Sequence, residues 1–133
     1  MPTEFDQQTF IEQIRSQGAE VRLSKTGNVL IVDFRPAPIQ QSPLDLNPLK
    51  HFDKLRELYL LNCPVDDKFL ALLAGLEKLQ TLDLRQTKVS ETGIAGLAAL
   101  PNLKLLLLSA NLISETFLRT FRTRMIGTRI IVE

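Results

Sequence analysis

The sequence predicts an α/β protein in which short strands and helices alternate along a repeating chain. Three observations predict this class: leucines recur every 24 residues, apolar residues alternate with period two in each strand segment, and a helical spacing follows each strand. A strand or a helix of this kind can bury its apolar side only against the next unit. We therefore expect one continuous stack of units.

The repeat is clearest in three segments that share the template L-x-x-L-x-L-x-x-[C/T/N]-x-[V/I]. LRELYLLNCPV, LQTLDLRQTKV and LKLLLLSANLI begin at Leu55, Leu79 and Leu103. An earlier copy, VLIVDFRPAPI, begins at Val29, and GTRIIVE begins a fifth copy. We predict a single domain, 1–133. Its parts are an N-terminal cap over 1–28, repeats over 29–54, 55–78, 79–102 and 103–126, and a terminal strand over 127–133.

The segment after each strand is predicted to be helical, because its apolar residues recur every three residues. They are Leu46, Leu49 and Phe52 in the first unit, Leu70, Leu73 and Leu76 in the second, and Ile94, Leu97 and Leu100 in the third. Asp66, Ser90 and Ser114 occupy one repeat position, and an acidic residue follows each. We expect these three side chains to cap the helices, and the acids to favour the positive end of the helix dipole.

The first 28 residues are predicted to cover the open core at one end of the stack. Residues 4–17 have an apolar stripe that includes Phe10, Ile11 and Ile14, and Gly18 is suited to end a helix. AEVRLS and VLIVDF flank residues 25–28, which predicts a β-hairpin with glycine in its loop. The hairpin would add an antiparallel strand to the first repeat, with the helix over the core.

Over residues 29–133 this pattern resembles leucine-rich repeat proteins. The 24-residue step with TKVSETGIAGLAALPNL is most similar to bacterial repeats of the ribonuclease-inhibitor-like or cysteine-containing type. The resemblance implies a short solenoid with a parallel sheet on its concave face and helices on its convex face. It also implies a protein–protein interaction module that binds its partner through the concave sheet and has no enzymatic activity.

One polar position of the template follows each strand and is filled by Cys63, Thr87 and Asn111. In the family that the chain resembles, this side chain points inward and bonds to backbone groups that the turn leaves without partners. An unsatisfied buried backbone group costs about 1–3 kcal/mol, so a small polar side chain is expected there. The alternative is a nucleophilic cysteine, but the single histidine, His51, lies before the strand and gives Cys63 no predicted partner.

The side chains that alternate with the buried leucines form the predicted partner-binding face. The residues assigned to it are Tyr59, Leu61, Asp83, Arg85, Leu105, Leu107 and Ile131. Apolar side chains on a face that should meet water mark an interaction surface. The pairs Asp33–Arg35 and Asp83–Arg85 are expected to be ordinary exposed ion pairs. Two alternatives stay open: self-association through the apolar half or the edge strand 130–132, and cover by the chain's own C-terminal segment.

Arginines gather in the last unit, at Arg119, Arg122, Arg124 and Arg129. By the 24-residue step, Arg124 stands where Leu76 and Leu100 stood, which is the polar replacement that a terminal repeat needs. We expect a solvated cap here, with binding of an anionic ligand as the alternative.

Composition argues against several functional classes. A net charge of +1 disfavours a nucleic-acid-binding protein, and a homodimer stays possible. One cysteine and one histidine disfavour a metal site, a disulfide framework and acid–base catalysis, so no cofactor is expected. No apolar run is long enough for a membrane helix, and MPTEFDQQTF does not resemble a signal peptide. The expected location is the cytoplasm.

Overall fold

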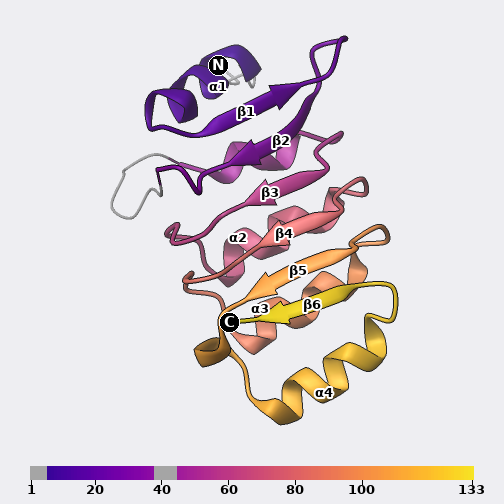
Figure 1. The fold of residues 1–133 in the computed structure, drawn as a ribbon. Coiled ribbons are helices and arrows are strands. Elements are labelled where there is room, and N and C mark those ends of the chain that lie inside the picture. The colour runs from indigo at the N-terminus through magenta and orange to yellow at the C-terminus, as the bar shows by residue number, and fades with distance from the viewer. Residues whose placement is uncertain (1–5, 38–44) are drawn as a thin grey trace.

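The computed structural model describes residues 6–37 and 45–133, with Asn111 described by its backbone alone. Its strands form one sheet in which neighbours along the chain are neighbours in space (Figure 1). The strands are β1 (Glu20–Leu23), β2 (Val29–Asp33), β3 (Glu57–Tyr59), β4 (Thr81–Asp83), β5 (Leu105–Leu108) and β6 (Arg129–Val132). β1 pairs antiparallel with β2, and every later pair is parallel. The predicted α/β class is confirmed.

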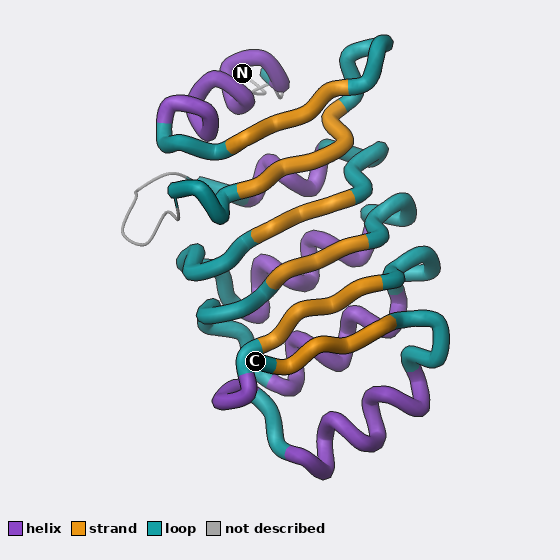
Figure 2. Tube along the Cα trace, viewed as in Figure 1, coloured by secondary structure: helices purple, strands orange, loops and turns teal. Residues whose placement is uncertain are grey.

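The described helical segments that follow β2 lie on one face of the sheet and leave the other face open (Figures 1 and 2). The α-helices are α1 (Gln7–Ser16), α2 (Asp67–Leu72), α3 (Glu91–Ala95) and α4 (Glu115–Arg124). Short 3-10 helices cover Asn47–His51, Leu73–Gly75, Gly96–Ala99 and Ala110–Leu112. Across the described ranges, we find no helix with the length and apolar character that a membrane crossing requires.

The parallel strands pair in a register that follows the 24-residue step. Leu58 lies opposite Leu82, Leu82 opposite Leu106, and Leu106 opposite Ile130. The first three of these side chains are fully buried, and Ile130 is almost so. Pairing of the backbone and packing of the leucine core are therefore set by the same alignment.

The N-terminal segment has the predicted helix and hairpin. α1 begins after Asp6, whose carboxylate accepts the backbone N–H of Thr9, and it ends before Gly18, which has a φ of 98°. Phe10, Ile11 and Ile14 are buried, so this helix covers the core beside the first strands (Figure 1). The part of the predicted helix before Asp6 lies outside the described residues.

The acidic residues at the helix starts have a role that we did not predict. Asp66 and Ser114 cap their helices as expected, by accepting the N–H of Phe69 and Phe117. Ser90 makes no side-chain cap; its N–H and hydroxyl both donate to the carboxylate of Asp67 in the preceding unit. Glu91 likewise accepts the N–H of Ser114, at 2.6 Å. The acids thus join the start of each helix to the start of the next.

The last unit differs from the prediction by one residue. Leu76, Leu100 and Met125 each follow the last helical residue of their unit and are buried, whereas Arg124 is exposed at the end of α4. The helical segment of the second unit, with six α-helical and three 3-10 residues, is about 15 Å long. Helix α4 reaches the same length with ten α-helical residues. An α-helix needs one more residue to cover the same length, so the buried position falls on Met125. The prediction that Arg124 takes the repeat position of Leu76 and Leu100 was therefore wrong.

Replacing Gly93 with alanine tests the contact between units. An added Cβ on Gly93, in α3, would overlap the carboxylate of Asp67 and displace it from Ser90. Helix propensity alone predicts that alanine stabilises by about 1 kcal/mol. We expect the reverse, a net loss of about 1 kcal/mol in the free energy of unfolding, because charge-assisted bonds are lost. Urea denaturation measures the change.

Gly96→Ala is the matched control, since a Cβ at Gly96 meets no atom within 4 Å. It should leave the free energy of unfolding equal to or above that of the parent protein. Equal stabilisation by both substitutions would show that the Asp67 contact contributes nothing.

Candidate functional site

The candidate site is the open face of the sheet, formed by residues that alternate with the buried apolar residues of β2–β6. We call it the sheet face. Its described residues are Ile31, Asp33 and Arg35 at β2, Glu57, Tyr59 and Leu61 at β3, Thr81, Asp83 and Arg85 at β4, Leu105, Leu107 and Ser109 at β5, and Arg129, Ile131 and Glu133 at β6. The register aligns them in three rows across the strands.

The apolar side chains of this face are half-buried, which corrects the expectation of an exposed apolar area. Leu105, Leu107 and Ile131 sit on the paired strands β5 and β6, where each flanks a neighbour about 5 Å away. Such neighbours on the same face of a sheet pack against one another and reduce the exposed area of each side chain. Tyr59 and Leu61 are also half-buried, and β4 separates them from β5. The most exposed large apolar side chain described, Ile126 at 90%, lies in the turn after α4.

Asp83 and Arg85 form an ion pair at the centre of the face in which the carboxylate is buried and the guanidinium half-buried, so the prediction of an ordinary exposed pair was wrong. Asp83 is 0% exposed, and its carboxylate accepts the backbone N–H, Nε and Nη2 of Arg85. Nη1 of Arg85 donates to Glu133 at 2.9 Å. These carboxylates hold the pKa of Arg85 above its ordinary value. The guanidinium is thus fixed in one orientation between β3 and β5.

A second Asp–Arg pair with the same bonds lies at β2, and the prediction of an ordinary exposed pair was wrong for its carboxylate as well, because Asp33 is buried whereas Arg35 is exposed. Asp33 accepts the backbone N–H, Nε and Nη2 of Arg35, and the guanidinium carbon lies 3.7 Å from the centre of the Tyr59 ring. Burial opposes ionisation of Asp33, but the Arg35 hydrogen bonds outweigh it and keep the pKa of this carboxyl below its usual value. Burial, together with donation of the phenol O–H to Glu57, raises the pKa of Tyr59 to about 12.

Two side chains at the turn position contact backbone carbonyls. The hydroxyl of Thr87 is buried and donates to the carbonyl of Leu84 at 2.7 Å. Cys63 is buried too, and its Sγ lies 3.8 Å from the carbonyl oxygen of Leu61. The side chain of Asn111 lies outside the described residues.

The C-terminal arginines divide into different settings. The N–H groups of Arg129 and Glu133 donate to carbonyls in or next to β5. Because backbone groups alternate in direction along a strand, the carbonyl of Ile130 points away from β5. Arg122 donates to this carbonyl at 3.2 Å and thereby covers part of the free edge of the sheet. Arg119, Arg124 and Arg129 are exposed.

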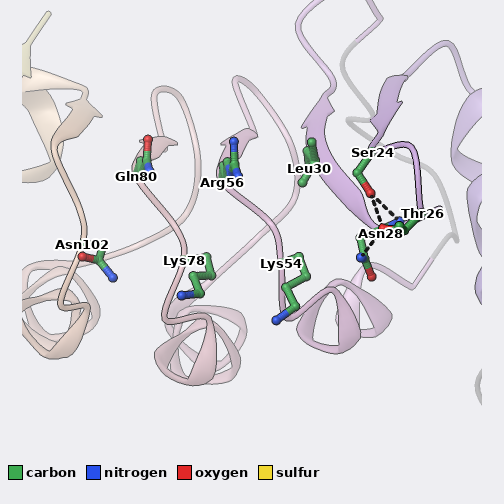
Figure 3. Close-up of a pocket in the computed structure, with 9 residues that line it drawn as sticks. All are labelled: Ser24, Thr26, Asn28, Leu30, Lys54, Arg56, Lys78, Gln80 and Asn102. Atoms are coloured by element: carbon green, nitrogen blue, oxygen red, sulfur yellow. Dashed lines mark hydrogen bonds between the residues drawn. The ribbon is translucent and has the colours of Figure 1, made fainter.

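A basic groove lies at the starts of the strands, and sequence reasoning did not find it (Figure 3). Lys54 and Lys78 occupy the same position in successive units, and Arg56 precedes β3. The 24-residue spacing of the two lysines could have indicated this groove. The sequence analysis instead placed the alternative anion-binding site at the C-terminal arginines.

Within the described ranges, no three histidine, cysteine, aspartate or glutamate side chains are grouped so as to hold a metal ion. Comparison with known protein families and with curated proteins finds no match to this chain. The arrangement offers an open face of half-buried apolar side chains around fixed guanidinium groups, which suits binding.

Replacing Arg85 with methionine is expected to destabilise the fold by about 3 kcal/mol, because Asp83 would remain buried without its partner. Arg35→Met is the matched control. The Arg35 side chain is 42% exposed, against 20% for Arg85, and water can solvate Asp33 more readily. We therefore expect a smaller loss there, about 1–2 kcal/mol, because Asp33 is buried but its side chain is not fully removed from water. Urea denaturation at neutral pH compares the two.

The double substitution Asp83→Leu with Arg85→Met removes the charge and should recover most of the stability. Equal losses in the two single arginine variants would contradict the buried position of Asp83.

Proposed function

We propose that this chain is a short leucine-rich repeat solenoid. The in-register pairing at 24-residue steps, with one strand and one helical segment in each unit, supports this architecture. So do the helical segments gathered on one side of the sheet (Figure 2). The N-terminal helix and hairpin, and the closing helix α4, are the caps that such an array needs.

Its proposed function is to bind another protein through the sheet face, without enzymatic activity. The observation that carries this proposal is the open face itself: no described helix or strand lies over it (Figure 1). Leu105, Leu107 and Ile131 are therefore only half-buried there. Apolar area rimmed by polar groups is typical of interaction sites.

The geometry favours a single helix or loop of the partner as the occupant. Parallel strands spaced at about 5 Å make the face of β2–β6 roughly 20 Å wide, which matches one such element. Arg35 and Arg85 have guanidinium groups held by buried carboxylates, so little side-chain entropy would be lost on contact. A partner segment with apolar residues next to hydrogen-bond acceptors would fit both features.

Self-association is the alternative and uses either the same apolar half or the edge strand β6. Arg122 argues against the edge, because its side chain already occupies an outward carbonyl of that strand. The proposal includes a cytoplasmic location, which suits a chain whose single cysteine allows no internal disulfide.

Leu105→Glu tests the proposed face more cleanly than Leu107→Glu. Leu107 lies opposite Asp83, so a glutamate there would face a buried carboxylate, whereas Leu105 lies between Thr81 and Arg129. We expect Leu105→Glu to reduce capture of a partner from source-organism lysate about tenfold or more, with an unchanged circular dichroism spectrum.

Ile126→Glu is the matched control, since it makes the same chemical change at an exposed site away from the sheet face. It should capture the partner as the parent protein does. A partner retained equally by all three proteins would contradict binding through this face. Light scattering that gives a dimer, lost in Leu105→Glu, would favour self-association instead.

A further inference from the structure

A groove of about 460 Å³ crosses the starts of the strands, at one edge of the sheet (Figure 3). Its wall comes from successive turns: the β1–β2 loop, then the segments that lead into β3, β4 and β5. The lining residues are Ser24, Thr26, Asn28, Leu30, Lys54, Arg56, Lys78, Gln80 and Asn102. None of them belongs to the sheet face, so a ligand in this groove would bind independently of the proposed protein partner.

The charge of this groove is positive and uncompensated. Of its nine lining residues, Lys54, Arg56 and Lys78 are cationic and none is acidic. Asp53 and Glu77 precede the two lysines in sequence, yet among the described residues the ion pairs involve only Arg35 and Arg85. Within the described ranges, two arginines of the sheet face are paired, whereas these three cations form no ion pair.

Neutral donors complete the lining. The hydroxyls of Ser24 and Thr26 lie 3.0 Å apart, and the Asn28 amide donates to Thr26, so this loop is held in place by its own bonds. The Asn102 amide donates to the carbonyl of Glu77, and Gln80 lies beside Arg56 in the groove (Figure 3). Hydroxyl and amide groups of this kind donate to the oxygens of an anion.

We propose that this groove binds a compact anion that carries two or more phosphate groups. Lysine ammonium groups act as point charges for phosphate, and the arginine fork can bond two phosphate oxygens at once. The lining holds one apolar residue, Leu30, and no aromatic ring. It therefore lacks the anchors that bind a peptide and the stacking surfaces that bind single-stranded nucleic acid.

Calorimetric titration with inorganic tripolyphosphate tests this proposal on the full chain. The groove variant is Lys54→Gln with Lys78→Gln. The matched control is Arg119→Gln with Arg124→Gln, which removes the same charge from exposed positions on α4. We expect one saturable site in the parent protein, at least about tenfold weaker binding in the groove variant, and unchanged binding in the control.

Adenosine triphosphate and a hexa-aspartate peptide are the two further ligands. Adenosine triphosphate should bind no more tightly than tripolyphosphate, because the lining offers its base no stacking partner. The proposal is overturned if the parent protein shows no saturable binding, if both double variants weaken binding equally, or if the peptide binds more tightly than tripolyphosphate. Circular dichroism of each variant confirms that the fold is retained.

Discussion

In-register pairing of strands 24 residues apart is the constraint on which the rest of the structure depends. Because Leu58, Leu82 and Leu106 lie opposite one another, the backbone ladder and the leucine core form together or not at all. The same alignment brings Asp67 to Ser90 and Glu91 to Ser114, so the helix starts follow the strands. A slip of one residue in a strand would turn its buried leucines to the open face.

That alignment also creates both candidate binding surfaces. Burying one set of side chains beneath the helices leaves the alternate set on an open face, where Asp83 is buried by strands on either side of β4. It stacks the turns before the strands as well, and so places Lys54 beside Lys78. Neither surface exists in an isolated unit. Because stacking brings cationic residues of successive units together, a chain with a net charge of only +1 can have a groove lined by positive charges alone.

The repeat spacing and the turn motifs were predictable from the sequence, whereas the side-chain contacts that depend on neighbouring units were predictable only in part. Leucine spacing predicted the parallel strands, and the loop around Gly27 predicted the hairpin. Burial of Asp83 was missed because Asp-x-Arg on a strand has the pattern of a surface pair, and its depth depends on residues 24 positions away. The buried Met125 was missed because the shift arises from helix type, which the apolar spacing does not reveal.

Amide hydrogen exchange of the bonds that cross successive strand pairs tests the central role of this alignment most directly. The N–H groups of Phe34, Leu60 and Leu84 donate to the carbonyls of Tyr59, Asp83 and Leu107, so they report on three consecutive pairs. If alignment makes ladder and core one unit, all three amides exchange through a single opening, with equal free energies that fall together as urea is added. Exchange of one amide while the others stay protected would contradict a single cooperative unit.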